Sequence, residues 1–264
     1  MNPVFRERYQ QGTTALHRLD ARVKLVMALL LALGVSLTPE GVWPVYALQW
    51  CLIAAVGAAG GLSAWRLGRA AAVALPFTLA AAALVFTTPG EPVARAGGLV
   101  ITGAGLARFL SIVLKSWLAV QAALLLAMTT PFDDILAAAR SLKVPDTLVA
   151  IVGFMYRYLY VLVDEAQSLL RARAARSAAL PGKPSGGSLR WRARVAGGMV
   201  GSLFLRSFER SERVYAAMLS RGYDGRLRGF APPPLDWRSA GWAALPVLLM
   251  AVTVVLAFVF RSSA

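Results

Sequence analysis

Residues 25–38 read LVMALLLALGVSLT, a run without a single charged side chain. A helix that crosses a bilayer needs about 20 predominantly apolar residues. Arg18, Arg22 and Lys24 lie just before the run, and such basic clusters are typical of the cytoplasmic end of a span. The stretch therefore predicts a membrane-spanning helix whose N-terminal end is cytoplasmic.

Comparable apolar runs recur along the chain, at residues 42–62, 70–87, 99–129 and 239–260. The composition agrees, because 58% of the residues are hydrophobic and only 16% are charged, against about 25% charged in soluble domains. The single cysteine, Cys51, excludes a disulfide-bonded secreted scaffold. The sequence predicts an all-α polytopic membrane protein with about five transmembrane helices, within a range of four to six.

The pattern changes after residue 130. Thr130-Pro131-Phe132-Asp133 predicts a helix start, with Thr130 as N-cap, proline at the first helical position and an acid at N3. Residues 146–163 are apolar enough to span, but basic residues precede them and follow them. A full crossing would place one basic cluster outside, so we predict long helices on the cytoplasmic side here, including a helix over 191–220.

Three parts follow from this organisation. Residues 1–130 form an N-terminal membrane bundle of four spans, residues 131–238 form the cytoplasmic-side module, and residues 239–264 form a C-terminal transmembrane helix.

The motifs of common active sites are missing from the sequence. It contains no phosphate-binding G-x-x-x-x-G-K-[ST], no G-x-S-x-G and no H-E-x-x-H. One histidine and one cysteine, far apart, do not make a metal site. We therefore expect no catalytic residue, no metal ligands and no directly bound cofactor. The net charge is +15, and the basic residues lie mostly between the apolar stretches. This placement indicates that they orient the spans in the membrane and dock partners, rather than bind nucleic acid.

Two short arginine sites stand out, AARSA at 174–178 and LSRGY at 219–223. Each arginine ends a predicted long helix between small residues, which let a partner approach closely, and a guanidinium can bind a carboxylate through two hydrogen bonds. Ordinary helix capping is the alternative interpretation. The candidate docking residues are Ala175, Arg176, Ser177, Ser220, Arg221 and Gly222.

Further charged residues lie in or near apolar segments. Lys115 sits within 99–129, and the sequence leaves open whether it has a structural role or contacts a partner. Arg108 is interpreted as reaching for the outer membrane surface. Arg157 is expected to pair with a carboxylate, because an unpaired buried charge is costly. The candidate partners of Arg157 are Asp133, Asp134 and Glu165.

The sequence resembles the transmembrane T component of energy-coupling factor (ECF) transporters, which includes the CbiQ-type cobalt and nickel proteins. Residues 17–25, HRLDARVKL, are similar to an N-terminal H-x-L-D-P-R-x-K signature, with Ala21 at the proline position. Arg176 and Arg221 fall where the family has two Ala-Arg-Gly-type motifs, here Ala-Arg-Ser and Ser-Arg-Gly. The middle section is similar at Thr129-Thr130-Pro131, Leu142-Lys143-Val144-Pro145, Tyr156-Arg157-Tyr158 and Asp164-Glu165-Ala166.

The resemblance implies a non-catalytic coupling subunit of an ECF-type ABC importer in a bacterial or archaeal plasma membrane. Two ATPase subunits, which bind ATP and Mg²⁺, would each receive one arginine-tipped helix, and their motion would reorient a membrane-embedded substrate-binding S component. Coupling or structural roles would fall to Arg157, Asp164, Glu165 and Lys115.

Cobalt or nickel is the substrate that we favour from this resemblance. One alternative is a T component shared among S components for vitamins. A self-contained secondary transporter and an intramembrane enzyme acting on lipid are the other functions considered.

Overall fold

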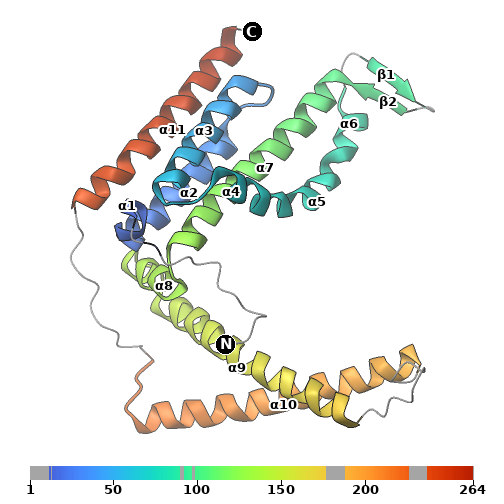
Figure 1. Cartoon of the computed structure of the whole chain (residues 1–264), viewed down its shortest axis with the longest axis vertical. Helices are drawn as coiled ribbons and strands as arrows, with labels where there is room; N and C mark the ends of the chain where they lie inside the picture. Colours follow the sequence, from blue (N-terminus) through green and yellow to red (C-terminus); the bar gives the residue numbers. More distant parts are fainter. Residues whose placement is uncertain are drawn as a thin grey trace. The chain divides into compact units, whose positions relative to one another are not determined.

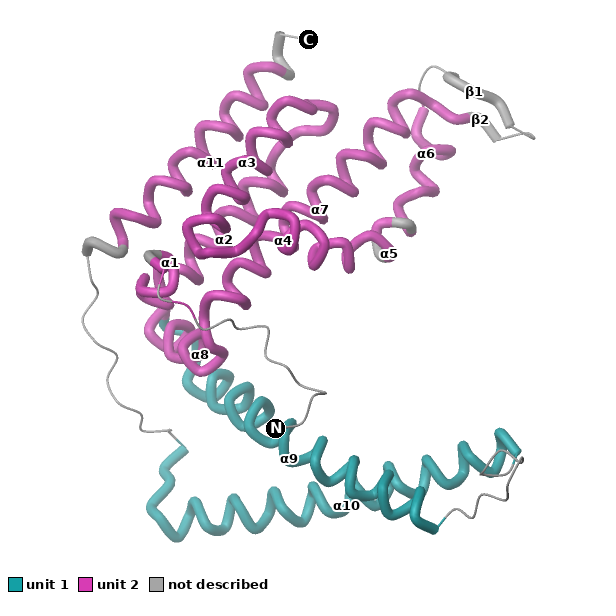
Figure 2. Tube along the Cα trace, viewed as in Figure 1, with its two compact units in different colours: residues 1–6, 143–231 teal, residues 7–142, 232–264 magenta. Residues whose placement is uncertain are grey.

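The computed structural model describes residues 12, 14–89, 92–96, 99–176, 188–225 and 237–263. The chain divides into two compact units (Figure 2). The membrane unit comprises residues 7–142 and 232–264, and the helix-pair unit comprises residues 143–231 together with 1–6.

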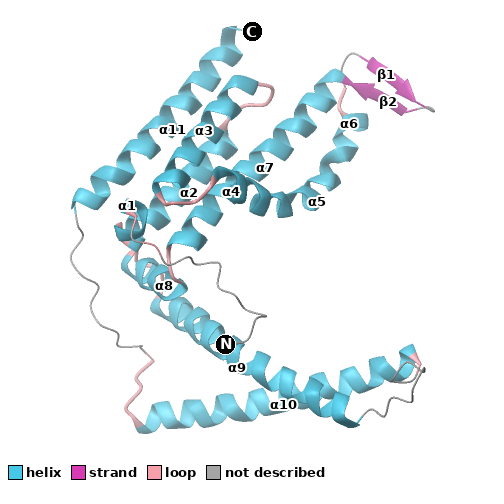
Figure 3. Ribbon diagram, in the orientation of Figure 1, coloured by secondary structure: helices cyan, strands magenta, loops and turns pink. Residues whose placement is uncertain are grey.

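Helices dominate both units (Figures 1 and 3). The long helices of the membrane unit are α2 (Ala21–Leu37), α3 (Trp43–Ala59), α7 (Gly103–Thr129) and α11 (Trp237–Ser263), with short α1 (Ala15–Arg18), α4 (Ala64–Ala71) and α8 (Phe132–Ser141). The helix-pair unit consists of α9 (Asp146–Arg176) and α10 (Leu189–Ser220). The predicted all-α membrane class is confirmed, and four of the five apolar runs correspond to α2, α3, α7 and α11.

Helix α2 is fixed at its start by local chemistry. Asp20 is its N-cap, and the Asp20 carboxylate accepts a hydrogen bond from the backbone N–H of Arg22 at 2.9 Å. The side chain of Lys24 is buried at 3% exposure. Its Nζ donates to the carbonyl of Thr129 at 3.1 Å and to that of His17 at 3.2 Å. Lys24 thus ties the basic segment before α2 to the last turn of α7.

The core of the membrane unit surrounds α2, which packs on both α7 and α11. Leu31 and Val35 are fully buried there. At Gly34 a Cβ atom would come within 2.5 Å of Met250 Cγ, so glycine permits the close approach of α11. Buried Gln49 on α3 joins the same helices, because its Nε2 lies 2.7 Å from Thr38 Oγ1 and 3.4 Å from Thr253 Oγ1.

Residues 70–87, predicted to be a span, do not form one regular α-helix, and their crossing of the membrane stays a prediction. The chain turns by 118° between α3 and α4, at Gly61 with a φ of +72° that favours glycine. After α4 it continues through 3₁₀ turns at Ala72–Ala74 and Leu79–Ala83 and short helices α5 (Leu75–Thr78) and α6 (Leu84–Thr87). Pro76 within this stretch lacks the N–H that a continuous helix needs.

Among the described residues, three helices are long and apolar enough to cross a membrane. They are α7, α9 and the stretch Ala240–Phe260 of α11, with a fourth if the bent pair of α3 and α4 is one span. Helix α2 has 17 residues and is therefore slightly shorter than the 18 residues required of a spanning helix here.

Two further details differ from the sequence prediction. The apolar run 99–129 does not begin as a helix, because Leu99–Thr102 forms strand β2, which pairs antiparallel with β1 (Pro92–Ala96). Thr130 is not the N-cap of α8, because Pro131 occupies that position.

Arg108 forms an ion pair with Glu40 at 3.2 Å. This contact links the α2–α3 loop to α7, and the position of Arg108 near the outer membrane surface stays a prediction.

Candidate functional site: the arginine-tipped helix pair

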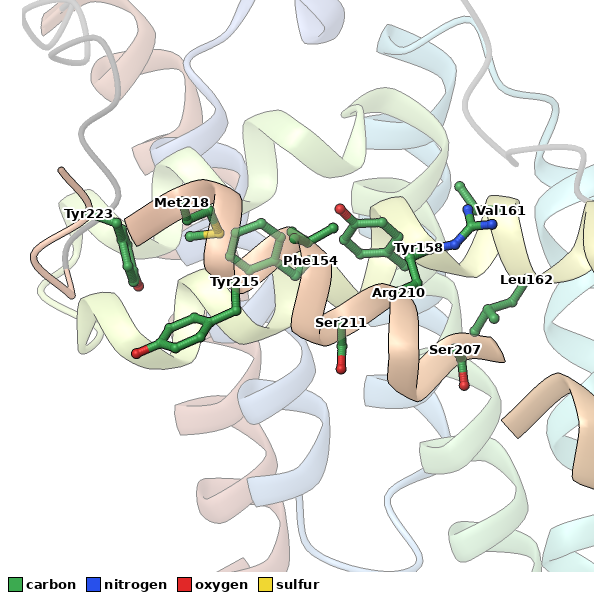
Figure 4. Close-up of a pocket in the computed structure, with 11 residues that line it drawn as sticks. Phe154, Tyr158, Val161, Leu162, Ser207, Arg210, Ser211, Tyr215, Met218 and Tyr223 are labelled. Carbon is green, nitrogen blue, oxygen red and sulfur yellow. The ribbon is translucent and has the colours of Figure 1, made fainter. Parts of the chain in front are cut away.

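The candidate site lies on α9 and α10, which run antiparallel within the helix-pair unit (Figure 4). The register of the two helices follows from the residue pairs that lie opposite each other. Glu165 on α9 faces Arg206 on α10, and Phe154 and Met218 line the same groove. Consequently the C-terminal end of α9 and the C-terminal end of α10 point in opposite directions (Figure 1).

A carboxylate clamps the two helices where they meet. Glu165 Oε1 accepts a hydrogen bond from Arg206 Nη1, and Glu165 Oε2 lies 3.9 Å from Arg210 Nη2. The Glu165 side chain is 25% exposed, whereas those of Arg206 and Arg210 are 57% and 41% exposed. Solvent screening limits each such pair to about 0–1 kcal/mol. The clamp therefore sets the geometry of the pair more than its stability.

An apolar groove of about 370 Å³ runs beside the clamp between α9 and α10 (Figure 4). Aromatic and aliphatic side chains from both helices form its walls. They include Phe154, Tyr158 and Leu162 from α9 and Val214, Tyr215 and Met218 from α10.

Arg176 is the last residue of α9, and its side chain is exposed, as is that of Ala175. The residues in the three helical turns before Arg176 are also exposed or half-exposed. The guanidinium is therefore at an accessible helix end. Ser177, the third member of this predicted site, lies outside the described residues.

Arg221 is the C-cap of α10, and the turn after it has the hydrogen bonds of a Schellman motif. The N–H of Gly222 donates to the carbonyl of Leu219 at 2.9 Å, and the N–H of Tyr223 donates to that of Met218 at 3.0 Å. Gly222 has a φ of +80°, a conformation that favours glycine. Tyr223 and Met218 both line the groove, so the cap fixes how the exposed Arg221 leaves the helix.

The two arginines are far apart on one pair of helices. At a rise of about 1.5 Å per residue, Arg176 lies about 16 Å beyond Glu165, and Arg221 lies about 22 Å beyond Arg206 in the opposite direction. Their separation is therefore roughly 35–40 Å. The arrangement can engage two partner surfaces at once, one at each end.

The other predicted residues are distributed over both units. Glu165 joins the clamp and does not pair with Arg157, which is exposed on α9. A pairing of Arg157 with Asp133 or Asp134 would connect the two units and stays a prediction. Asp164 is exposed beside the clamp, and Lys115 is half-buried on α7 of the membrane unit.

Sequence reasoning missed Arg206 and Arg210. The signal for them was weak, since both belong to an α10 rich in arginine, and the carboxylate that they contact lies about 40 residues earlier on another helix.

A protein-family model described as cobalt transport protein, CbiQ, matches residues 12–230. The chain belongs to the CbiQ family. The match extends from α1 to beyond α10 and includes both arginine tips. The resemblance to T components of ECF transporters is thereby confirmed.

Curated relatives agree with the CbiQ assignment. The chain is 28% identical, over 94% of both chains, to "Energy-coupling factor transporter transmembrane protein EcfT" of Limosilactobacillus fermentum. It is 30% identical to "Nickel permease LarQ" of Lactiplantibacillus plantarum, over 42% of this chain and 38% of the relative. It is 28% identical to "Cobalt transport protein CbiQ" of Rhodobacter capsulatus, over 41% of this chain and 42% of the relative.

Proposed function

We propose that this protein is the coupling subunit of an ECF-type ABC importer. Arg176 and Arg221 each dock into one of two ATP-binding-cassette ATPase subunits, and ATP and Mg²⁺ bind to those subunits. Closing of the ATPases moves the arginine tips, and α9 and α10 pass the motion to a membrane-embedded S component. In this proposal the subunit has no catalysis and no cofactor of its own.

One observation carries the proposal: the antiparallel α9 and α10 place the two exposed arginines at opposite ends of one clamped pair. Two ATPase subunits need two separate docking points. Arg176 and Arg221, roughly 35–40 Å apart, provide one point for each subunit. A guanidinium at a helix end between small residues suits a carboxylate in a narrow partner groove.

The exposed apolar surface of the helix pair supports contact with an S component. Val200, Phe204 and Leu205 on α10 are 67%, 65% and 63% exposed. Large exposed apolar patches mark contacts with a protein or a membrane. We assign this surface, with the adjacent groove, to the moving contact between the helix pair and the S component.

Cobalt or nickel is the proposed substrate, held by the S component. The description of the family model and the names of LarQ and CbiQ support a metal substrate. The alternative is one T subunit that is shared among S components for vitamins. We place the protein in a bacterial or archaeal plasma membrane with its N-terminus in the cytoplasm.

The test is a pull-down from native membranes with the tagged full-length protein, run beside the double variant Arg176→Ala/Arg221→Ala. Wild type should recover two ABC ATPase subunits and an S protein, whose identity separates metal from vitamin transport. The double variant should insert normally and lose most of the ATPase, because one bidentate contact is lost at each tip.

The matched control is Arg171→Ala/Arg213→Ala, which also removes one exposed arginine from each helix but leaves both tips intact. If both double variants lose the same amount of ATPase, general charge explains the binding and the docking role is wrong. If the inserted wild type recovers no ATPase, the coupling function itself is contradicted.

A further inference from the structure

A second groove, of about 490 Å³, lies in the membrane unit between α2, α11 and the end of α8. Its volume falls within the range of about 300–1,000 Å³ that is typical of ligand sites. The groove is lined only by residues of the membrane unit, so it is not part of the arginine-tipped pair.

The walls of the groove follow one stripe on each long helix. On α2 the stripe includes Val26, Met27 and Leu30, and on α11 it includes Ala243, Ala244 and Val247. Together with Ala240, the α11 residues follow the i, i+3, i+4, i+7 spacing of one helix face, and the small alanine side chains leave space that bulkier residues would fill. Val26 and Leu30 are 39% and 40% exposed, so the groove is open at the surface of the membrane unit.

The rim of the groove is polar at one end. Arg22, at the start of α2, and Ser141, at the end of α8, both line it. The Arg22 side chain is 18% exposed, and its Nε lies 4.0 Å from Asp20 Oδ1. A guanidinium carries five donors, so Arg22 can bind a phosphate oxygen and keep its contact with Asp20.

We propose that this groove binds one anionic phospholipid, with an acyl chain between α2 and α11 and its phosphate at Arg22. Because the apolar runs predict that α2 and α11 span the membrane, the occupant comes from the bilayer, and the site pairs an apolar groove with a cation at one end. A phospholipid has the same division between apolar chain and anionic head. The proposal does not depend on ATPase docking.

The experiment uses the full-length protein in detergent micelles, with native mass spectrometry of bound phosphatidylglycerol and phosphatidylcholine. Wild type should retain one phosphatidylglycerol in preference to phosphatidylcholine. Arg22→Gln should weaken retention of phosphatidylglycerol about tenfold, as expected for one hydrogen bond to a charged group. Ala244→Trp, at an exposed position in the groove, should abolish it by filling the space.

Two controls match these variants. Arg66→Gln removes an exposed arginine from the first turn of α4, and Val252→Trp places the same indole side chain on a part of α11 outside the groove. Both should retain the lipid as wild type does. Equal retention by Arg22→Gln and Arg66→Gln, or by Ala244→Trp and Val252→Trp, would mean unspecific annular lipid and would overturn the proposal.

Discussion

At the scale of single residues, the docking function depends on how an arginine leaves the end of a helix. Arg221 is held by a Schellman turn whose positive φ falls on Gly222. A Cβ at such a position costs about 1–2 kcal/mol, although nothing lies within 4 Å of it. The glycine is therefore required by the backbone conformation and not by lack of space.

We expect Gly222→Val to loosen the end of α10 and to weaken ATPase recovery, while the protein still inserts. Hydrogen exchange at the amides of Gly222 and Tyr223 measures the loosening directly. Gly222→Asn should restore much of the protection, because asparagine tolerates the left-handed region better than other residues with a side chain. The control Gly198→Ala lies in mid-helix with open space around it and should stabilise α10. Unchanged exchange in Gly222→Val would contradict the role of this cap.

At the scale of elements, the Glu165 clamp fixes two long helices against each other. Glu165→Gln removes the negative charge that Arg206 and Arg210 share. Because both pairs are partly exposed, we expect a loss of only about 0.5–1 kcal/mol. We expect a larger effect on geometry, because Glu165 contacts both Arg206 and Arg210 where the two helices cross.

Electron-spin distance measurement between labels at Ala172 and Ser202, in a Cys51→Ser background, tests this geometry. Glu165→Gln should broaden the distance distribution. The matched control is Glu209→Gln, whose partner Arg213 lies 3.8 Å away on the same helix. A distribution equally broad in both variants would show that the clamp does not position the helices.

At the scale of the whole molecule, the proposed function depends on which segments cross the bilayer. Helix α9 is long and apolar enough to span, yet basic clusters flank its apolar part on both sides. The charge distribution favours a cytoplasmic α9 that does not cross.

Cysteine labelling with a membrane-impermeant maleimide on intact cells, in the Cys51→Ser background, decides this. Glu40→Cys, in the loop between α2 and α3, should react from outside. Ser63→Cys and Ser188→Cys should react only after the membrane is permeabilised. Reaction of Ser188→Cys in intact cells would mean that α9 crosses the membrane, and the proposed docking of both tips in the cytoplasm would then be wrong.

Much of this architecture could be predicted from the sequence, because apolar runs and basic flanks are local signals. The runs at 25–38, 99–129 and 239–260 became α2, α7 and α11. The break within 70–87 was missed, since hydropathy does not distinguish a straight helix from one interrupted by 3₁₀ turns and Pro76.

The helix ends at Arg176 and Arg221 were predicted from small residues and glycine in the sequence. The clamp was not, because Glu165 meets Arg206 only through the antiparallel packing of two helices. The groove between α2 and α11 also escaped prediction, since it depends on two segments more than 200 residues apart.

The clamp also has a consequence for the length of the two helices. Eleven residues separate Glu165 from Arg176, and eleven separate Arg210 from Arg221. Because eleven residues make about three full turns, each arginine leaves its helix on nearly the same side as the clamp. Inserting one residue between clamp and tip would swing the guanidinium by about 100° around the helix axis. The segment between the clamp and each arginine should therefore tolerate many substitutions but few changes in length. An insertion that preserves function should add whole helical turns.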